Sequence, residues 1–320
     1  MKLRWGILGA ARITRRGLIP GIRGSETGVV SALASRDEAK ARSWADEFSI
    51  PRIYGSYGEL LADSEIDAVY LPLPNELHRP WVEAAADSGK HILCEKPLAL
   101  NSAEARAMVD HCHSRGVLLM EAFMWRHHPR AKELRAMVAE GGIGELRLVR
   151  ASFSFPIEPG DWRLDPARGG GALWDVGCYG IDAARFFTGG EPTRFQASAR
   201  WSGQGVDLGL TAALEFPGGV LASIDCGFDQ PDRCFLELVG SEGTIAVPEA
   251  FVPPSDVAAT AILTAGDGSP RALQFAVADQ YAAMVDAFGL SVAAGRLLEP
   301  AENGLATMEA LDAVLAVARA

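Results

Sequence analysis

Near the start of the chain stands Leu3-Arg4-Trp5-Gly6-Ile7-Leu8-Gly9-Ala10-Ala11-Arg12-Ile13-Thr14, an apolar run that leads into a turn of small residues. In the pattern G-x-G-x-x-G, the glycines make a tight turn, let backbone approach a pyrophosphate and allow close helix packing. Here Gly9 keeps the first position, while Ala11 and Thr14 replace the other two glycines. Taken alone, the motif also fits an ordinary strand-to-helix turn, so the surrounding segments decide its interpretation.

The residues from Leu3 to about Ala122 alternate between short apolar runs and helical patterns, which predicts βαβ units and a parallel sheet. The predicted strands are Leu3–Leu8, Val29–Ala34, Ile66–Leu71, His91–Cys94 and Val117–Met120. The predicted helices are Glu38–Phe48, Leu77–Ala86 and Ala103–His113, with Asp37, Asn75 and Ser102 as candidate caps.

Beyond Glu121 the pattern changes to one helix near Arg130–Ala139 followed by long β-like segments. These segments include Leu146–Phe155, Leu210–Phe216 and Val220–Cys226, and the patterns Asp279–Ala293 and Ala301–Ala318 predict closing helices. We therefore expect a Rossmann domain over residues 1–122. Residues 123–320 should form an α+β domain with a large, mainly antiparallel sheet.

Composition narrows the possible functions. A chain of 320 residues with 48% hydrophobic content can bury two cores, and its net charge of −11 argues against a nucleic-acid partner. Its 5 cysteines show no C-x-x-C pair, which favours a reducing cytoplasm. No apolar run is long enough to span a bilayer, and no histidine pair has the spacing of a metal site, so we expect neither membrane nor metal binding.

Cys94-Glu95-Lys96-Pro97 follows an apolar run and places a lysine at the carboxyl end of a predicted buried strand. Ligands bind at that edge in open α/β sheets. The proline constrains the lysine before it. An isolated Lys-Pro pair is more often an exposed loop, so the functional interpretation depends on the other motifs.

Four segments together give the chain a recognisable pattern. They are Gly9-Ala10-Ala11-Arg12-Ile13, Glu95-Lys96-Pro97, Glu121-Ala122-Phe123-Met124-Trp125-Arg126 and Gly169-Gly170-Gly171-Ala172-Leu173-Trp174-Asp175-Val176-Gly177-Cys178-Tyr179. In this order and spacing, the sequence resembles the Gfo/Idh/MocA family of nicotinamide-dependent oxidoreductases. It looks most like the dihydrodiol dehydrogenase and D-xylose dehydrogenase branch.

The resemblance implies a Rossmann domain, an open-faced sheet domain and a catalytic set of Lys96, Asp175 and Tyr179. Lys96 would contact the reacting oxygen of a sugar or alcohol, and Asp175 would orient the substrate, pair with Lys96 or serve as a first-turn aspartate of its helix. Most of the family has histidine at position 179, whereas tyrosine stands here, as in the branch named above.

Oxidation of an alcohol requires the hydroxyl proton to leave as hydride moves to the nicotinamide. A phenol has a pKa near 10, so it acts as a base at neutral pH only when positive charge lowers that pKa. We therefore hypothesise that Tyr179 is the acid/base and that Lys96 lowers its pKa and polarises the substrate oxygen.

The candidate cofactor contacts lie at the ends of the predicted strands. Ser35 and Arg36 stand where the ribose-reading residue is expected, and an arginine there favours NADP(H) over NAD(H), which stays possible. Asp37 is interpreted as a helix cap. The remaining candidates at strand ends are Gly9, Ala10, Ala11, Arg12, Ile13, Glu95 and Lys96. The resemblance adds Pro74, Asn75, His78, Trp162 and Arg163, although a histidine in the first turn of a helix is more often a solvated or packing residue.

Substrate contacts are expected from Trp125, Phe153 and Arg163 besides the catalytic set. Trp162-Arg163 suits a sugar ring or a phosphate, although Trp162 could equally pin a surface turn. The expected function is hydride transfer between NADP(H) and a sugar or cyclic diol, with an aldopyranose oxidised at C1 as the leading substrate. The alternative is a catalytically silent NADP(H)-binding sensor. The resemblance also implies a homodimer or higher homo-oligomer.

Overall fold

The computed structural model describes residues 2–298 and 301–320, which fall into two compact units. The first unit contains the residues up to His127 together with Asp279–Leu305. The second contains His128–Ala278 and Ala306–Ala320. Residues 279–298 thus pack with the first unit, whereas the sequence analysis places them in the second domain.

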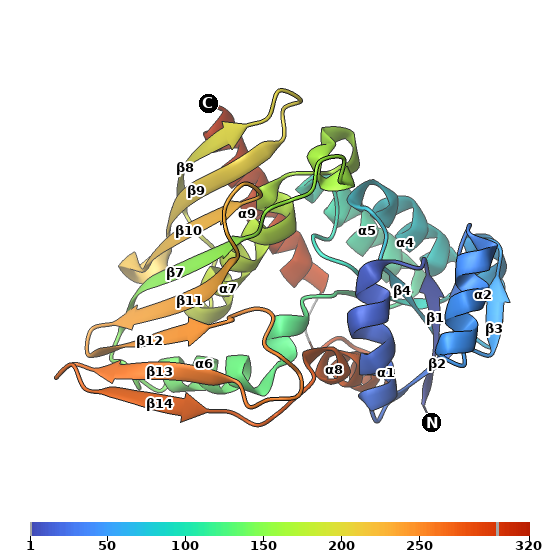
Figure 1. The fold of residues 1–320 in the computed structure, drawn as a ribbon, viewed down its shortest axis with the longest axis horizontal. Helices are drawn as coiled ribbons and strands as arrows, with labels where there is room; N and C mark the ends of the chain where they lie inside the picture. Colours follow the sequence, from blue (N-terminus) through green and yellow to red (C-terminus); the bar gives the residue numbers. More distant parts are fainter. Residues whose placement is uncertain (1, 299–300) are drawn as a thin grey trace. The chain divides into compact units, whose positions relative to one another are not determined.

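A parallel sheet of 6 strands forms the centre of the first unit (Figure 1). Its order is β3-β2-β1-β4-β5-β6, so the winding of the chain reverses between β1 and β4. Ligands of such sheets bind beyond the carboxyl ends of the strands at that switch point. The strands are β1 (Leu3–Leu8), β2 (Gly28–Ala34), β3 (Arg52–Tyr54), β4 (Ala68–Leu71), β5 (His91–Cys94) and β6 (Leu119–Glu121).

Helices connect these strands and flank the sheet. They are η1 (Thr14–Leu18), α1 (Ile19–Gly24), α2 (Glu38–Glu47), α3 (Tyr57–Leu61), η2 (Asn75–Leu77), α4 (His78–Asp87), α5 (Ser102–Arg115), η3 (Met124–His127) and α8 (Gln280–Ala294). Asp37 caps α2 by accepting the Lys40 N–H at 2.9 Å, as predicted. For α5 the prediction was wrong by one residue: Asn101, not Ser102, accepts the Glu104 N–H at 2.9 Å.

Close packing of α8 on the first helix explains why residues from the end of the chain belong to the first unit. A Cβ at Gly17 would lie 2.6 Å from the Tyr281 ring, and one at Gly21 would lie 2.6 Å from the Cβ of Tyr281. Asp286 of α8 also accepts the Glu26 and Thr27 N–H groups, at 2.9 and 3.0 Å. Because only glycine permits this approach, the backbone of the first helix packs directly against the Tyr281 side chain of α8.

The second unit contains an 8-stranded sheet with the order β14-β13-β12-β11-β7-β10-β9-β8. Only the β7–β10 pair is parallel, which confirms the predicted mainly antiparallel sheet. The strands are β7 (Leu146–Ser154), β8 (Arg194–Trp201), β9 (Asp207–Glu215), β10 (Leu221–Gly227), β11 (Arg233–Gly240), β12 (Gly243–Pro248), β13 (Thr260–Ala265) and β14 (Pro270–Gln274).

The helices of the second unit gather on one face of this sheet (Figure 1). They are α6 (Pro129–Ala139), α7 (Cys178–Thr188) and α9 (Ala301–Arg319). The part of α9 from Ala306 onward belongs to this unit. The short helical turns are η4 (Trp162–Leu164), η5 (Pro166–Arg168), η6 (Leu173–Gly177) and η7 (Pro217–Gly219). Gly180 of α7 lies against Ile224 and Ala151, so these two side chains face the helices. The residues next to them along the strands point to the opposite face of the sheet, which the helices leave open. On that open face, Arg150 pairs with Glu237 at 2.8 Å and Arg233 with Asp225 at 2.9 Å.

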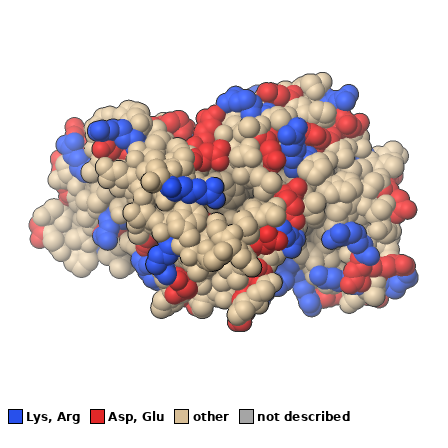
Figure 2. Space-filling model, turned by 90° about the horizontal axis from the view of Figure 1, so that it is seen from above, with Lys and Arg blue, Asp and Glu red and all other residues tan. Residues whose placement is uncertain are grey.

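Among the described residues, no helix is both long and apolar enough to cross a membrane. Figure 2 shows one face of the molecule, on which basic and acidic side chains are interspersed rather than gathered into one basic surface.

Candidate active site

The loop after β1 has the geometry expected of a dinucleotide-binding turn. Gly9 has a φ of +122°, a conformation that favours glycine, and its N–H donates to the Ala34 carbonyl at 2.9 Å. A Cβ at this position would lie 3.1 Å from Leu73 and 3.4 Å from the Tyr57 hydroxyl, so it would press on Leu73 in addition to straining the backbone. Ala10 and Ala11 follow, and a helix begins at Arg12 and Ile13. These residues fit a pyrophosphate, because N–H groups at a helix start favour anions.

The end of β2 carries the candidate cofactor-discriminating side chains. Ser35 is buried, and its hydroxyl accepts the Asp37 N–H at 3.1 Å, whereas Arg36 is exposed. Tyr57 of α3 hydrogen-bonds Arg36; burial raises the pKa of this phenol, and the guanidinium partly opposes the rise. Sequence reasoning missed Tyr57, because α3 lies some twenty residues further along the chain.

Lys96 lies directly after β5 at the carboxyl edge of the parallel sheet, and its peptide bond to Pro97 is cis. The preceding Glu95 accepts a hydrogen bond from the Tyr70 hydroxyl and one from the Lys96 N–H at 3.2 Å. Burial and the Glu95 carboxylate both raise the pKa of Tyr70, so this phenol stays protonated and donates. In the structure, Glu95 therefore holds the backbone that presents Lys96.

His78 packs against the same loop, which is the alternative to its predicted cofactor contact. The side chain is fully buried, with Nδ1 at 3.1 Å from the Pro97 carbonyl and Nε2 at 2.8 Å from the Leu73 carbonyl. Burial lowers the pKa of this imidazole. Both ring nitrogens face backbone, so His78 connects the loop after β4 with the Lys96–Pro97 turn instead of facing a ligand.

Three further predicted contacts of the first unit differ in exposure. Pro74 is half-buried and precedes η2, where Asn75 is 5% exposed. Trp125 of η3 is 2% exposed. A contact from Asn75 or Trp125 to a ligand would therefore involve a small part of the side chain.

Arg163 and Asp175 form the polar centre of the candidate site in the second unit. Arg163 Nε lies 2.9 Å from Asp175 Oδ2, and Arg163 Nη1 lies 3.2 Å from Asp161 Oδ1. Burial works to lower the pKa of Arg163, but the two carboxylates outweigh it and raise that pKa. Asp175 lies in the first turn of its helix, and Arg163 is one of its ion-pair partners. Its expected roles toward the substrate and Lys96 stay predictions.

Trp162 supplies the apolar surface beside this ion cluster. The guanidinium carbons of Arg163 and Arg168 lie 5.0 and 5.5 Å from the centre of its ring. Both distances are typical of cation–π contacts. Trp162 is half-buried, so one indole combines stacking with neighbouring donors, a combination that suits a sugar ring.

Tyr179 belongs to an aromatic cluster. Its ring centre lies 5.3 Å from that of Phe153 and 5.2 Å from that of Phe251, and the Phe153 and Phe251 rings are stacked at 5.8 Å. Tyr179 is 5% exposed. Phe251 was not anticipated, because it follows β12 about a hundred residues after Phe153. The cluster fixes the phenol ring by packing.

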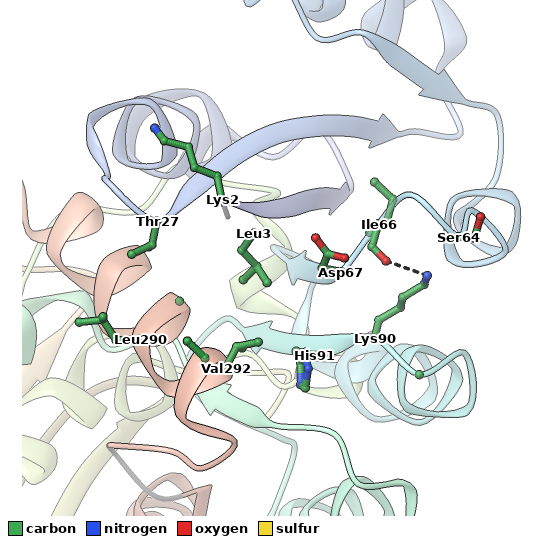
Figure 3. A pocket seen from close by; sticks show the side chains of 13 residues that line it. Lys2, Leu3, Thr27, Ser64, Ile66, Asp67, Lys90, His91, Leu290 and Val292 are labelled. Carbon is green, nitrogen blue, oxygen red and sulfur yellow. Dashed lines mark hydrogen bonds between the residues drawn. The ribbon is translucent and has the colours of Figure 1, made fainter.

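A groove of about 640 Å³ lies at the other edge of the first unit's sheet (Figure 3). Its lining includes Leu3, Asp67 and His91, at the amino ends of β1, β4 and β5. The Lys90 ammonium points to the Ile66 carbonyl at 2.8 Å and also donates to the Asp63 carbonyl at 2.7 Å. This groove is thus separate from the carboxyl edge, where Gly9, Arg36 and Lys96 lie.

No cluster of three or more potential metal-ligating side chains occurs in the part of the chain that the structure describes.

The Rossmann sheet and the residues at its carboxyl edge define a dinucleotide-binding oxidoreductase class, and the comparisons identify the family. Residues 3–123 match the model of an oxidoreductase family with an NAD-binding Rossmann fold, and residues 131–246 match the GFO/IDH/MocA C-terminal domain. The chain belongs to the GFO/IDH/MocA family of oxidoreductases. The expectation of a nicotinamide-dependent oxidoreductase is confirmed.

Known relatives lie in the expected branch. The chain is 40% identical over 316 residues to D-xylose 1-dehydrogenase (NADP(+)) 2 of Haloferax volcanii, covering 98% of this chain and 96% of the relative. It is 35% identical to trans-1,2-dihydrobenzene-1,2-diol dehydrogenase of Mus musculus, covering 79% and 77%. The crystal structure of KijD10, a 3-ketoreductase from Actinomadura kijaniata in complex with NADP and TDP-benzene, superposes with a TM-score of 0.93 at 34% identity, covering 99% and 98%.

Proposed function

We propose that the chain is an NADP-dependent aldose dehydrogenase that oxidises an uncharged sugar at C1. The observation that carries this proposal is its identity of 40% to an NADP(+)-dependent D-xylose dehydrogenase over 98% of the chain. The ion cluster beside Trp162 supports a polyol ligand, because hydroxyl groups can accept from the guanidinium and donate to the carboxylates.

Arg36 is our candidate for recognition of NADP(H) over NAD(H). It is an exposed guanidinium at the end of β2, hydrogen-bonded to Tyr57 and preceded by the Ser35 hydroxyl. A guanidinium can hold a 2′-phosphate with two hydrogen bonds, which a ribose hydroxyl cannot match. Gly9, Ala10, Ala11, Arg12 and Ile13 would hold the pyrophosphate, while Pro74, Asn75 and Glu95 would contact or support the nicotinamide side.

Lys96, Tyr179 and Asp175 are our candidates for the chemical step. The bound nicotinamide supplies the hydride acceptor. Tyr179 takes the hydroxyl proton, since a buried phenol becomes a base when a cation lowers its pKa, and Lys96 supplies that charge and binds the reacting oxygen. Asp175 holds Arg163 at 2.9 Å, and the two orient the remaining hydroxyl groups.

The charge around Arg163 favours an uncharged substrate. Its guanidinium faces the Asp161 and Asp175 carboxylates, so a sugar diphosphate placed there would meet both negative groups. The relation to a 3-ketoreductase crystallised with TDP-benzene makes a nucleoside diphosphate sugar the specific competitor. Trp125, Phe153 and Trp162 would line the sugar.

We extend the proposal to the roles of the two units, the oligomeric state and the cellular location. The first unit would bind NADP, and the second would bind the substrate and mediate oligomerisation. The open face of the second sheet, with its Arg150–Glu237 pair and exposed Leu221, is the candidate surface for a homodimer. Five cysteines without a C-x-x-C pair favour the cytoplasm.

The test is NADPH formation by the whole protein with aldoses, inositols, cyclic diols and a nucleoside diphosphate sugar, each with NADP or NAD. We expect turnover with an uncharged aldose and NADP. Turnover with the nucleotide sugar alone would refute the substrate proposal. NADP binding without turnover of any compound would favour the sensor.

A further inference from the structure

The helix that carries Asp175 and Tyr179 begins without a cap from its own neighbourhood. It starts at Ala172 and passes through the π-helical turn Leu173–Gly177 into α7, and no local side chain bonds to its first N–H groups. The preceding residues are Gly169, Gly170 and Gly171, which have no side chains to offer. The first N–H groups of any helix lack intrahelical acceptors, so another part of the chain must satisfy them.

Asp207, at the start of β9, supplies the acceptor from 34 residues further along the chain. Its Oδ2 accepts the Leu173 N–H at 2.7 Å, and the Ala172 N–H also bonds to this carboxylate. The side chain is 3% exposed. A negative charge at this end of a helix is favourable, because it faces the positive end of the helix dipole.

The glycine run is shaped around this carboxylate. A Cβ at Gly171 would lie 2.2 Å from Asp207 Oδ1, and one at Gly170 would lie 2.3 Å from the Arg163 carbonyl. The Gly171 N–H donates to that same carbonyl at 3.0 Å. The backbone thus runs between Arg163 on one side and Asp207 on the other.

These contacts connect Asp207 to the candidate catalytic residues. The Asp175 N–H donates to the Gly171 carbonyl at 3.0 Å, and the Asp175 side chain pairs with Arg163 at 2.9 Å. Tyr179 follows one turn later on the same helix. A shift of the first turn would therefore move Asp175, its partner Arg163 and the phenol together.

Stability alone is a poor reason for a carboxylate at this position. Burial raises the pKa of Asp207 to about 6, against the backbone donors and the neighbouring Arg319, which lower it. The ionised form is thus held at the expense of stability. Such a residue is expected where a site needs its geometry fixed.

We propose that Asp207 is a positioning residue for the reaction: its buried carboxylate fixes the first turn of the helix that presents Asp175 and Tyr179. The proposal rests on the proposed function for its kinetic consequence, whereas the effect on the helix itself is independent of the substrate.

The kinetic test compares Asp207→Ala, Asp207→Asn and a control, Asp267→Ala, in the whole protein. Asp267 is an exposed aspartate of the same unit that accepts the Ser269 N–H at 2.9 Å in the β13–β14 turn. For Asp207→Ala we expect kcat for the aldose to fall about 10- to 100-fold, because small misplacement of reacting groups has effects of that size. The NADP(H) Kd should change much less than kcat, since most of the candidate cofactor contacts lie in the first unit.

Asp207→Asn keeps one oxygen for the Leu173 N–H, so its kcat should lie between those of Asp207→Ala and the parent, while Asp267→Ala should match the parent. A residue that only stabilises the fold would lower Tm without changing kcat per folded molecule. A kcat of Asp207→Ala within about two-fold of the parent would overturn the proposal.

Amide hydrogen exchange measures the same effect without a substrate. We expect the amides of residues 173–179 to exchange faster in Asp207→Ala than in the parent, and to change little in Asp267→Ala. Faster exchange in a protein that oxidises no sugar would refute the proposed function and keep the positioning of the helix. Unchanged exchange at 173–179 would refute the positioning itself.

Discussion

Replacing Asp207 by asparagine should remove a loss of stability that the parent shows as pH rises from about 4 to 7. The pKa of this carboxyl is about 6 in the folded chain and about 3.8 without its surroundings. Between these values the folded state holds a proton that the unfolded state has released. Stability from this group is therefore complete below about pH 4 and is lost as pH rises through 6.

The magnitude follows from the size of the pKa difference. A shift of about two pKa units corresponds to roughly 2 to 3 kcal/mol at 1.36 kcal/mol per unit. Because Asp207 is 3% exposed, solvent screens little of this energy. Asparagine cannot ionise. The free energy of unfolding of Asp207→Asn minus that of the parent should therefore rise by about this amount between pH 4 and pH 7.

The assay is urea unfolding of parent and Asp207→Asn across pH 4 to 8, with the difference in free energy of unfolding plotted against pH. All other ionisable groups are present in both proteins, and the nearby Cys226 stays protonated across this range because burial raises its pKa well above the usual value. A difference that stays constant across this range would show that Asp207 is not a buried carboxyl with a raised pKa.

Arg36→Ala should raise the NADP Kd about 10- to 100-fold and leave the NAD Kd nearly unchanged, because it removes charge-assisted hydrogen bonds to a 2′-phosphate; equal losses for both cofactors by fluorescence titration would contradict this. Lys96→Ala and Tyr179→Phe should each lower kcat by about 10²-fold or more while NADPH still binds; turnover within a few-fold of the parent would exclude them from the chemical step. Gly171→Ala should destabilise the fold by about 3 kcal/mol, because its Cβ would lie 2.2 Å from Asp207 at a φ of +129°. The matched Gly268→Ala, at a φ of +82° with open space around it, should lose only about 1 kcal/mol, and equal Tm changes would contradict the packing argument.

Local patterns predicted most of the first sheet. The strands Leu3–Leu8 and His91–Cys94 have the predicted bounds, because both are short apolar runs that end at a change to small or polar residues. The three-residue strand Arg52–Tyr54 is too short and too polar for such a pattern. The edge strand β14 is largely exposed and holds only two apolar residues, Ala272 and Leu273, so it also lacks a strong apolar pattern.

Contacts between segments that are distant in the chain could not be predicted from the sequence. His78 was a candidate ligand contact until its ring was found between the Leu73 and Pro97 carbonyls. Phe251 and Asp207 reach the helix of Tyr179 from remote strands, and no local motif marks either residue. The motif residues Gly9, Lys96 and Asp175 were predicted because their types and spacing depend on chemistry that recurs in the family.

The most direct test of the central claim follows the hydride itself. The parent enzyme would be incubated with NADP and D-xylose deuterated at C1, and the mass of the NADPH formed would be measured by mass spectrometry. The account predicts that NADPH gains the deuterium and that turnover slows relative to unlabelled xylose when hydride transfer limits the rate. NADPH that forms without deuterium would contradict oxidation at C1, and no NADPH from xylose or any other aldose would contradict an aldose dehydrogenase.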